Sequence, residues 1–222
     1  MHTPPSAARA PRSRAASRAW GRPRPTRAAT SPARLGSYTP QGGPDIRATH
    51  AALPGGGPAS HYVVAWMTTA AVTLQATDLY PPPPAGARLA VRKHVLAPAG
   101  DAQLAGCVDG KAASPGCVDI LPAGAKPTIP AVGSSIEDFS LTAVYEQASN
   151  GAFFLGELEK FVHVSPQRFE RVAVGGKGPC GLAVRVVGAP GERVRLAAVD
   201  PKGVVHLATA SLPSAGVVDV EM

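Results

Sequence analysis

A two-residue alternation of apolar and polar side chains runs through the last fifty residues and restricts them to extended structure. In the run GLAVRVVGAPG, the side chains of Leu182, Val184 and Val186 fall on one face of a strand, and ERVRLAAV repeats the pattern. Such strands recur about every 8–12 residues between turns, which is typical of antiparallel sandwiches and barrels. No apolar stripe of helical period extends beyond two turns. We therefore predict a mainly β fold, an antiparallel β-sandwich or meander.

Earlier parts of the chain carry the same alternation, broken by turn residues. Residues 61–80 predict a hairpin, because two strand-like runs flank a short polar stretch. A further strand is predicted in ARLAVRKHV, where Ala90, Arg92 and His94 fall on one face, and a short one over Val118–Leu121. Two more strands, DFSLTAVYE and AFFLGELEKFVHV, lie before and after a predicted Asn150–Gly151 turn.

The net charge of +7 is confined to the N-terminus. Residues 1–47 hold nine Arg and a single acid, Asp45, so the remainder is close to neutral. A segment of Ala, Arg, Pro and Ser with few apolar residues cannot bury enough surface to offset the entropy of ordering it. We expect a disordered N-terminal tail over residues 1–58. Because the folded region is neutral, we expect no nucleic-acid partner.

The predicted folded region covers residues 60–222. A stretch rich in Gly, Pro and Ala interrupts it and is longer than a compact domain usually holds as a loop. We expect a β-sandwich region that can divide into two sub-sheets, 60–121 and 136–222, on either side of this loop. The apolar run near residue 70 is too short and too rich in Thr to cross a bilayer, so we predict no membrane span.

Two features of the sequence indicate different cellular compartments for the protein. An Arg- and Ser-rich start with few acids has the composition of an organellar transit peptide, although a biased leader or an RNA-binding arm has a similar composition. Cys107 and Cys117 bracket a loop that a disulfide could close, which indicates an oxidising, secretory compartment. The alternative is that these thiols and Cys180 are free and buried. Localisation stays open between organellar import and secretion.

The search for catalytic and metal-binding patterns is negative. Glu157 and Glu159 lie two apart, which places both carboxylates on one face of a strand, and glycoside hydrolysis needs paired carboxylates. An exposed strand edge produces the same spacing, and we favour that interpretation. The four histidines of the predicted folded region show no metal-ligand or catalytic spacing: His61, His94, His163 and His206. We predict no catalytic residue, no metal site and no cofactor.

One run carries a family resemblance: YVVAWMTTAAVTLQATDLYPPPPAGARLAVRKHV. It resembles the opening of the C-terminal β-sandwich of melibiase-type α-galactosidases, with Trp66, Val72–Leu74, Asp78–Leu79 and Val91–Arg92 at the matching places. The run FFLGELEKFVHVSPQRFERV resembles segments in the β-sandwich portions of some carbohydrate-active enzymes. The catalytic (β/α)₈ barrel of the family and its paired Asp residues have no counterpart here. The resemblance therefore implies a non-catalytic accessory domain of a glycoside hydrolase-like protein.

Three classes of function follow from these observations: an accessory β-sandwich, a stand-alone binding or interaction module, or an enzyme whose site the sequence does not reveal. The expected partners of the accessory domain are a carbohydrate or a separate catalytic barrel. Tyr62 and Trp66 lie four residues apart on one strand face and could form a sugar-stacking platform. The scarcity of aromatic residues favours core positions for both, and Phe139 and Phe169 are also expected to be buried.

Overall fold

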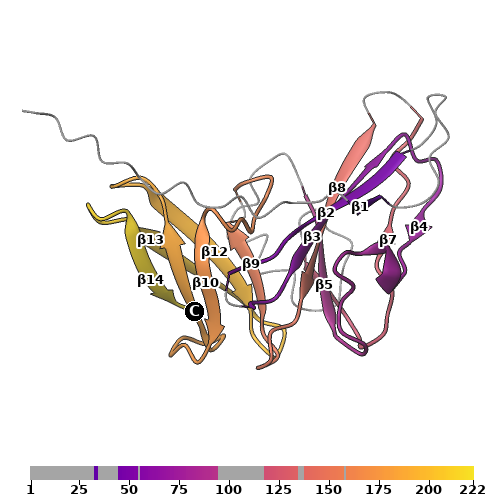
Figure 1. Ribbon diagram of the computed structural model, residues 1–222. Helices are drawn as coiled ribbons and strands as arrows, with labels where there is room; N and C mark the ends of the chain where they lie inside the picture. Colours follow the sequence, from indigo (N-terminus) through magenta and orange to yellow (C-terminus); the bar gives the residue numbers. More distant parts are fainter. Residues whose placement is uncertain (1–32, 35–44, 55, 95–117, 135–137, 158) are drawn as a thin grey trace, which may run out of the picture.

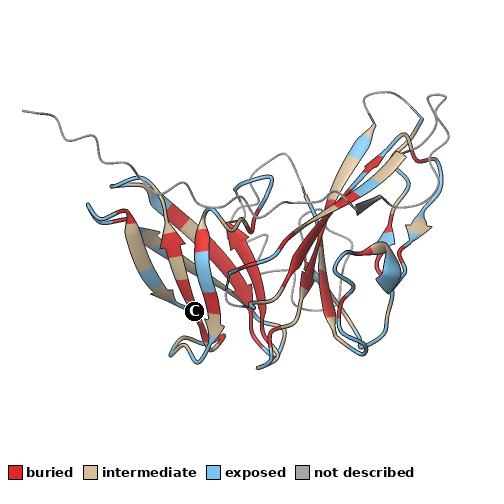
Figure 2. Ribbon diagram, viewed as in Figure 1, coloured by how far each residue is buried: buried red, intermediate tan, exposed pale blue. Residues whose placement is uncertain are grey.

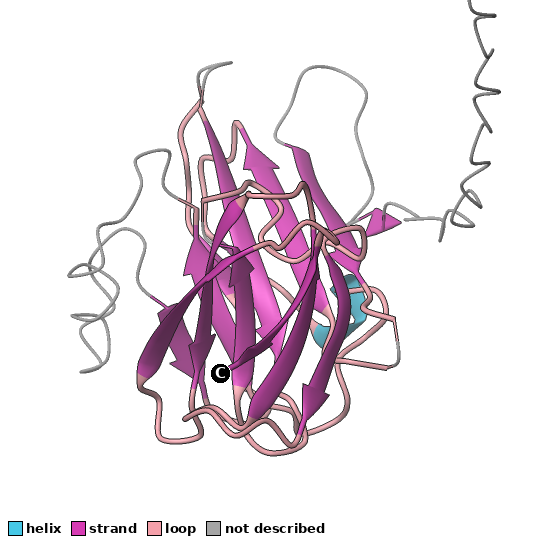
Figure 3. Cartoon of the chain, turned by 90° about the vertical axis from the view of Figure 1, so that its left-hand side faces the viewer, coloured by secondary structure: helices cyan, strands magenta, loops and turns pink. Residues whose placement is uncertain are grey.

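The computed structural model describes residues 33–34, 45–54, 56–94, 118–134, 138–157 and 159–222, and these residues form a mainly β structure of antiparallel sheets (Figure 1). Among them the helical content is confined to a 3-10 turn, Ala76–Asp78, which is cyan in Figure 3. The predicted fold class is confirmed. No helix in the described part of the chain is long and apolar enough to cross a membrane.

The larger sheet has six strands in the order β1-β2-β3-β8-β5-β6, and every neighbouring pair is antiparallel. Its strand β8 lies between β3 and β5, which come much earlier in the chain. A short pair, β4 with β7, stands beside this sheet. The bounds are β1 Ala33–Arg34, β2 Asp45–Ala51, β3 Ser60–Trp66, β4 Val72–Thr73, β5 Leu89–Lys93, β6 Val118–Leu121, β7 Thr128–Ile129 and β8 Phe139–Glu146.

The C-terminal part is a sandwich of two three-stranded sheets, with the orders β10-β11-β14 and β13-β12-β9. Figure 1 shows these strands on the left and the six-stranded sheet on the right, with β9 between them. The inward residues expected from the alternation, Leu182 and Val184 on β11 among them, are buried to 1% exposure or less. The bounds are β9 Phe153–Glu157, β10 Phe169–Val174, β11 Leu182–Val187, β12 Arg193–Val199, β13 Val205–Ser211 and β14 Val217–Glu221.

Two apolar cores cover the two faces of the six-stranded sheet. The core of the sandwich continues onto one face, where it includes Tyr62, Ala143 and Tyr145. Figure 2 shows buried segments in red on strands of both the sandwich and the six-stranded sheet. A second core covers the opposite face, where Val63 and its neighbours pack against residues from the β4 and β7 region. Strand β3 is therefore buried on both faces at its beginning, but not at its end.

The N-terminal boundary differs from the prediction. Residues 45–51 belong to the tail predicted over 1–58, but they form strand β2, which pairs with β3 over its full length. Its segment DIRATHA is polar in composition, yet Ala48 and Ala51 are buried because they face the two cores. Residues 1–32 and 35–44 of the predicted tail lie outside the described residues.

Two predicted hairpins are also corrected. The hairpin predicted over residues 61–80 does not form. Strand β3 pairs with β2 and β8, while β4 pairs with β7, because the chain turns away at Met67, which has a φ of 53°. The Asn150–Gly151 turn does form, but its flanking strands meet at a single bridge and then join different sheets. Strand β8 belongs to the first sheet, so the division between the two parts falls after Glu146 rather than before residue 136.

Candidate functional site

An exposed aromatic patch lies at the open end of the sheet face that the sandwich covers elsewhere. We define this aromatic patch as Val64, Trp66 and Phe139, with Asp45 and Arg47 at its edge. Strand pairing places its members side by side, because Trp66 is paired with Asp45 on β2 and with Phe139 on β8. Directly paired side chains on one sheet face contact each other at short distances.

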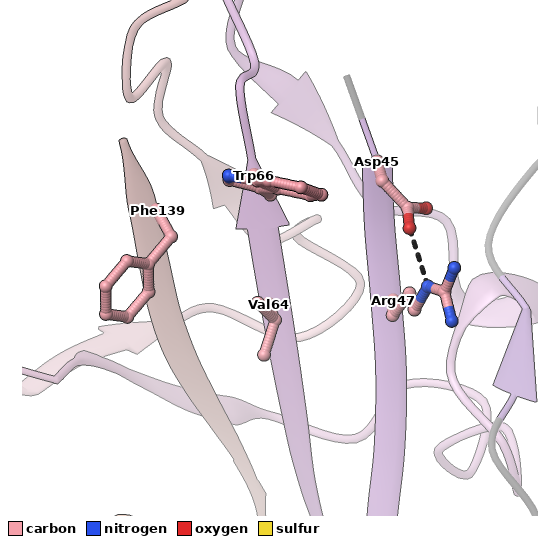
Figure 4. Close-up of a pocket in the computed structure, with 5 residues that line it drawn as sticks. All are labelled: Asp45, Arg47, Val64, Trp66 and Phe139. Atoms are coloured by element: carbon pink, nitrogen blue, oxygen red, sulfur yellow. Dashed lines mark hydrogen bonds and ion pairs between the residues drawn. The ribbon is translucent and has the colours of Figure 1, made fainter. Parts of the chain in front are cut away.

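The aromatic patch forms a shallow depression of about 370 Å³ that opens to solvent. Trp66 is 38% exposed and Phe139 is 53% exposed, which is unusual for large apolar side chains on a sheet. Figure 4 shows the two rings on neighbouring strands, with Val64 next to Trp66 along the same strand. At the edge, Arg47 Nε donates to Asp45 Oδ2 at 2.6 Å, so charged groups border the apolar surface.

The structure separates the two residues predicted as a sugar platform. Tyr62 is buried in the core shared with the sandwich, whereas Trp66 remains half-exposed on the same strand face. The expectation that Phe139 is buried is wrong, because the sandwich core reaches along this face only as far as the partly buried Leu141, one row before Phe139. Phe169 is fully buried, as expected. The partner of Trp66 is therefore Phe139, on the paired strand.

A buried polar cluster occupies the covered end of the same face. The row after the Trp66–Phe139 pair holds Val64 and Leu141, and the next row holds Tyr62, Ala143 and Arg92. Arg92 is only 2% exposed, and its Nη1 lies 2.9 Å from His163 Nε2. Because a guanidinium can only donate, His163 Nε2 is the acceptor. The ring proton of a neutral His163 then lies on Nδ1, which is 2.6 Å from the Tyr145 hydroxyl.

Burial and charge keep this cluster neutral apart from Arg92. Burial, together with Arg92 and His94, lowers the pKa of His163 to about 3. Burial and Arg92 also lower the pKa of His94, whose Nδ1 lies 3.4 Å from His163 Nε2. Burial raises the pKa values of Tyr62 and Tyr145, so both hydroxyls stay protonated. The row of Val64 and Leu141 lies between this cluster and the Trp66–Phe139 pair of the aromatic patch.

Glu157 and Glu159 do not form a carboxylate pair. Glu157 is 4% exposed and receives Arg168 Nε at 2.9 Å, while Arg168 also contacts Glu192. Glu159 is exposed and lies near Arg195. The prediction that both carboxylates lie on an exposed strand face is wrong, because Glu157 is held by a cation from the turn before β10. A carboxylate bound in this way stabilises structure and is not available as a general acid.

The remaining predicted sites are the three cysteines and a metal site, and Cys180 is the cysteine that lies among the described residues. Cys180 is a free thiol in the sandwich core, and burial raises its pKa to about 11, so it is unreactive at neutral pH. Cys107 and Cys117 lie outside the described residues. Among the residues that the structure describes, no three His, Cys, Asp or Glu side chains gather as they would around a metal ion.

Comparison with known proteins adds no assignment: no protein family matches the chain, and neither a curated protein nor a solved structure is significantly similar to it. The site is therefore defined by its geometry alone. Sequence reasoning identified Trp66 but missed Phe139, which lies 73 positions further along and is placed beside it only by the pairing of β3 with β8. It also missed the contact between Arg92 and His163.

Proposed function

We propose that the chain is a non-catalytic β-sandwich module that binds a carbohydrate on the aromatic patch. The observation that carries the proposal is the exposed Trp66–Phe139 pair on a rigid sheet face. The C–H face of a sugar ring stacks on an aromatic ring, while its hydroxyls need polar partners at the rim. Asp45 can accept hydrogen bonds there, and Arg47 can donate them.

The shape of the aromatic patch supports a chain-like sugar rather than an enclosed small molecule. The depression is open and shallow, and its floor is formed by three neighbouring strands, β2, β3 and β8. Enclosed small-molecule pockets bury most of their ligand, which this surface cannot do. An accessory role beside a glycoside hydrolase barrel, as the sequence resemblance implies, would use such a surface to hold the polysaccharide near the catalytic domain.

The proposal predicts that Trp66→Ala, which removes the stacking surface, weakens polysaccharide binding about tenfold or more, a change that corresponds to about 1.4 kcal/mol of binding free energy for each factor of ten. Affinity electrophoresis in gels containing galactomannan, xylan or mixed-linkage β-glucan measures the retardation of the full chain. Phe139→Ala should reduce retardation in the same gel. Tyr80→Ala is the matched control, because Tyr80 is an exposed aromatic residue at 58% that lies outside the aromatic patch.

The same variants distinguish binding from packing. A fully buried Trp would lose roughly 3–5 kcal/mol of unfolding free energy on truncation, whereas we expect Trp66→Ala to lose less than about 2 kcal/mol. Retardation that is unchanged in Trp66→Ala and Phe139→Ala, or absent for all three polysaccharides, would contradict the proposal. A change in oligomeric state of Trp66→Ala, without any retardation of the wild type, would assign the aromatic patch to a protein partner instead.

A further inference from the structure

The connection between β9 and β10 joins the two halves of the molecule through a few polar contacts. We define the β9–β10 connection as residues 159–168. Its middle docks on the six-stranded sheet, where the Tyr62 hydroxyl receives the Val164 N–H at 2.6 Å and donates to the Val164 carbonyl at 3.1 Å. Its end is held on the sandwich by the contacts of Arg168 with Glu157 and Glu192.

His163 is the side chain of the connection that enters the sheet. It is 1% exposed and faces Arg92 on β5, His94 just after β5, Tyr145 on β8 and Tyr62 on β3. The neighbouring residues Phe161 and Val162 are about half exposed, and the Phe161 ring contacts the His94 ring at a centroid distance of 4.7 Å, so the fully buried part of the docking is formed by other residues. The contact with the sheet therefore depends strongly on His163 and Val164.

A proton on His163 is incompatible with this contact. Nε2 is the acceptor for Arg92 Nη1 at 2.9 Å, and a protonated Nε2 would become a second donor facing the guanidinium. Two positive charges would then lie together in a buried site, where their repulsion is weakly screened. His94, on the same side, cannot supply a negative charge. Only undocking, which places the imidazolium in water, relieves the conflict.

We propose that the β9–β10 connection is an acid-sensitive latch: when His163 takes up a proton, the connection leaves the six-stranded sheet while the sandwich remains folded. Histidines that are neutral when docked and charged when released are the usual basis of such switches. The Glu192 carboxylate, which lies just before β12 and holds the end of the connection through Arg168, does not titrate in this pH range, because hydrogen bonding to Arg168 lowers its pKa to about 2. The latch operates whatever ligand the aromatic patch binds.

The test is NMR-detected hydrogen exchange of the full chain, expressed as protection factors to remove the intrinsic pH dependence. The Val164 amide reports docking through its bond to Tyr62, and the Glu157 amide reports it through its bond to the His163 carbonyl. A single proton taken up on opening predicts protection that falls about tenfold for each pH unit below about 6, and about a hundredfold between about pH 7.5 and about pH 4.5. Amides in β11 and β12 should keep their protection over this range.

His163→Gln supplies the critical variant, because glutamine can accept from Arg92 and donate to Tyr145 without titrating. We expect its Val164 protection to be independent of pH over the same range. His206→Gln is the matched control: this histidine lies on β13, which β12 separates from β9, and it contacts Asp200, so its loss should leave the pH dependence intact. A pH dependence that persists in His163→Gln overturns the latch.

Two further results keep the proposal testable if His163→Gln does not fold. In the wild type, histidine ring resonances should show a docked His163 that stays neutral and a released form that titrates near its ordinary pKa. Protonation of His163 in the docked form above about pH 5 contradicts the latch. Simultaneous loss of protection in Val164, β11 and β12 also contradicts it, because that pattern is global acid unfolding rather than local release.

Discussion

Gly156→Ala is expected to lower the free energy of unfolding by about 2–5 kcal/mol, or to prevent folding. Gly156 has a φ of +79°, in the left-handed region where any Cβ costs about 1–2 kcal/mol. It also lies at a bulge of β9 against β12, and a Cβ there would stand 2.1 Å from the His163 carbonyl oxygen. Since that oxygen belongs to the backbone of the docked β9–β10 connection, relief requires the connection to move, which adds roughly 1–3 kcal/mol.

Gly191→Ala is the matched control for this prediction. Gly191 has a φ of +78°, and a Cβ added to it would meet no atom within 4 Å. It should therefore lose only the conformational part, about 1–2 kcal/mol. Urea unfolding followed by far-ultraviolet circular dichroism measures both variants. Equal losses in the two variants would show that the close approach of His163 to β9 is not maintained in solution.

Arg168→Met is expected to lose about 3 kcal/mol of unfolding free energy. The variant keeps most of the apolar stem but leaves the buried Glu157 carboxylate with the exposed Lys160 ammonium, 4.0 Å away, in place of the guanidinium, and removing one partner of a buried pair is strongly destabilising. Arg185→Met is the control, because Arg185 and its partners Glu170 and Asp219 are all exposed. An exposed pair is worth about 1 kcal/mol or less. Chemical denaturation of both variants at neutral pH measures the difference.

A second substitution tests the physical reason for the Arg168 effect. Glu157→Gln in the Arg168→Met background removes the uncompensated charge, so it should recover part of the lost stability. Glu157→Gln alone should be destabilising, since it breaks the ion pair in an otherwise intact site. If the double variant is as unstable as the sum of the two single variants, the two side chains are not coupled and the assignment of Glu157 to a structural ion pair is wrong.

The C-terminal sandwich could be predicted from the sequence because its strands are marked by alternation within each segment and by turns between consecutive strands. Residues such as Leu182 and Val194 alternate with polar neighbours, and turns such as Asp200–Gly203 join strands that pair directly. The two-residue period fixes which side chains point inward, whatever the partner strand is. The predicted inward faces of β11 and β12 therefore match the buried residues.

The six-stranded sheet and the candidate site depend on pairings that leave no local signal. Strand β2 lies in a polar, Arg-containing segment without a clear alternation of apolar residues, and it is a strand because β3 pairs with it. The exposure of Phe139 depends on how far the sandwich reaches along the sheet, which no pattern within β8 encodes. Arg92 and His163 are 71 positions apart, and the sequence shows only that Arg92 and His94 share a strand face.

The central position of β8 has a consequence for synthesis of the chain. Strand β3 needs β8 on one side, and β5 can join the sheet only through β8, although both are made more than 45 residues earlier. Pairings across such separations form late, because closing the loop costs entropy before any contact is gained. Until Glu146 has left the ribosome, β3 and β5 present unpaired edges that other chains could extend. The edges of β3 and β5 that face β8 in the finished sheet therefore remain unpaired, and prone to aggregation, until the middle of the chain has been translated.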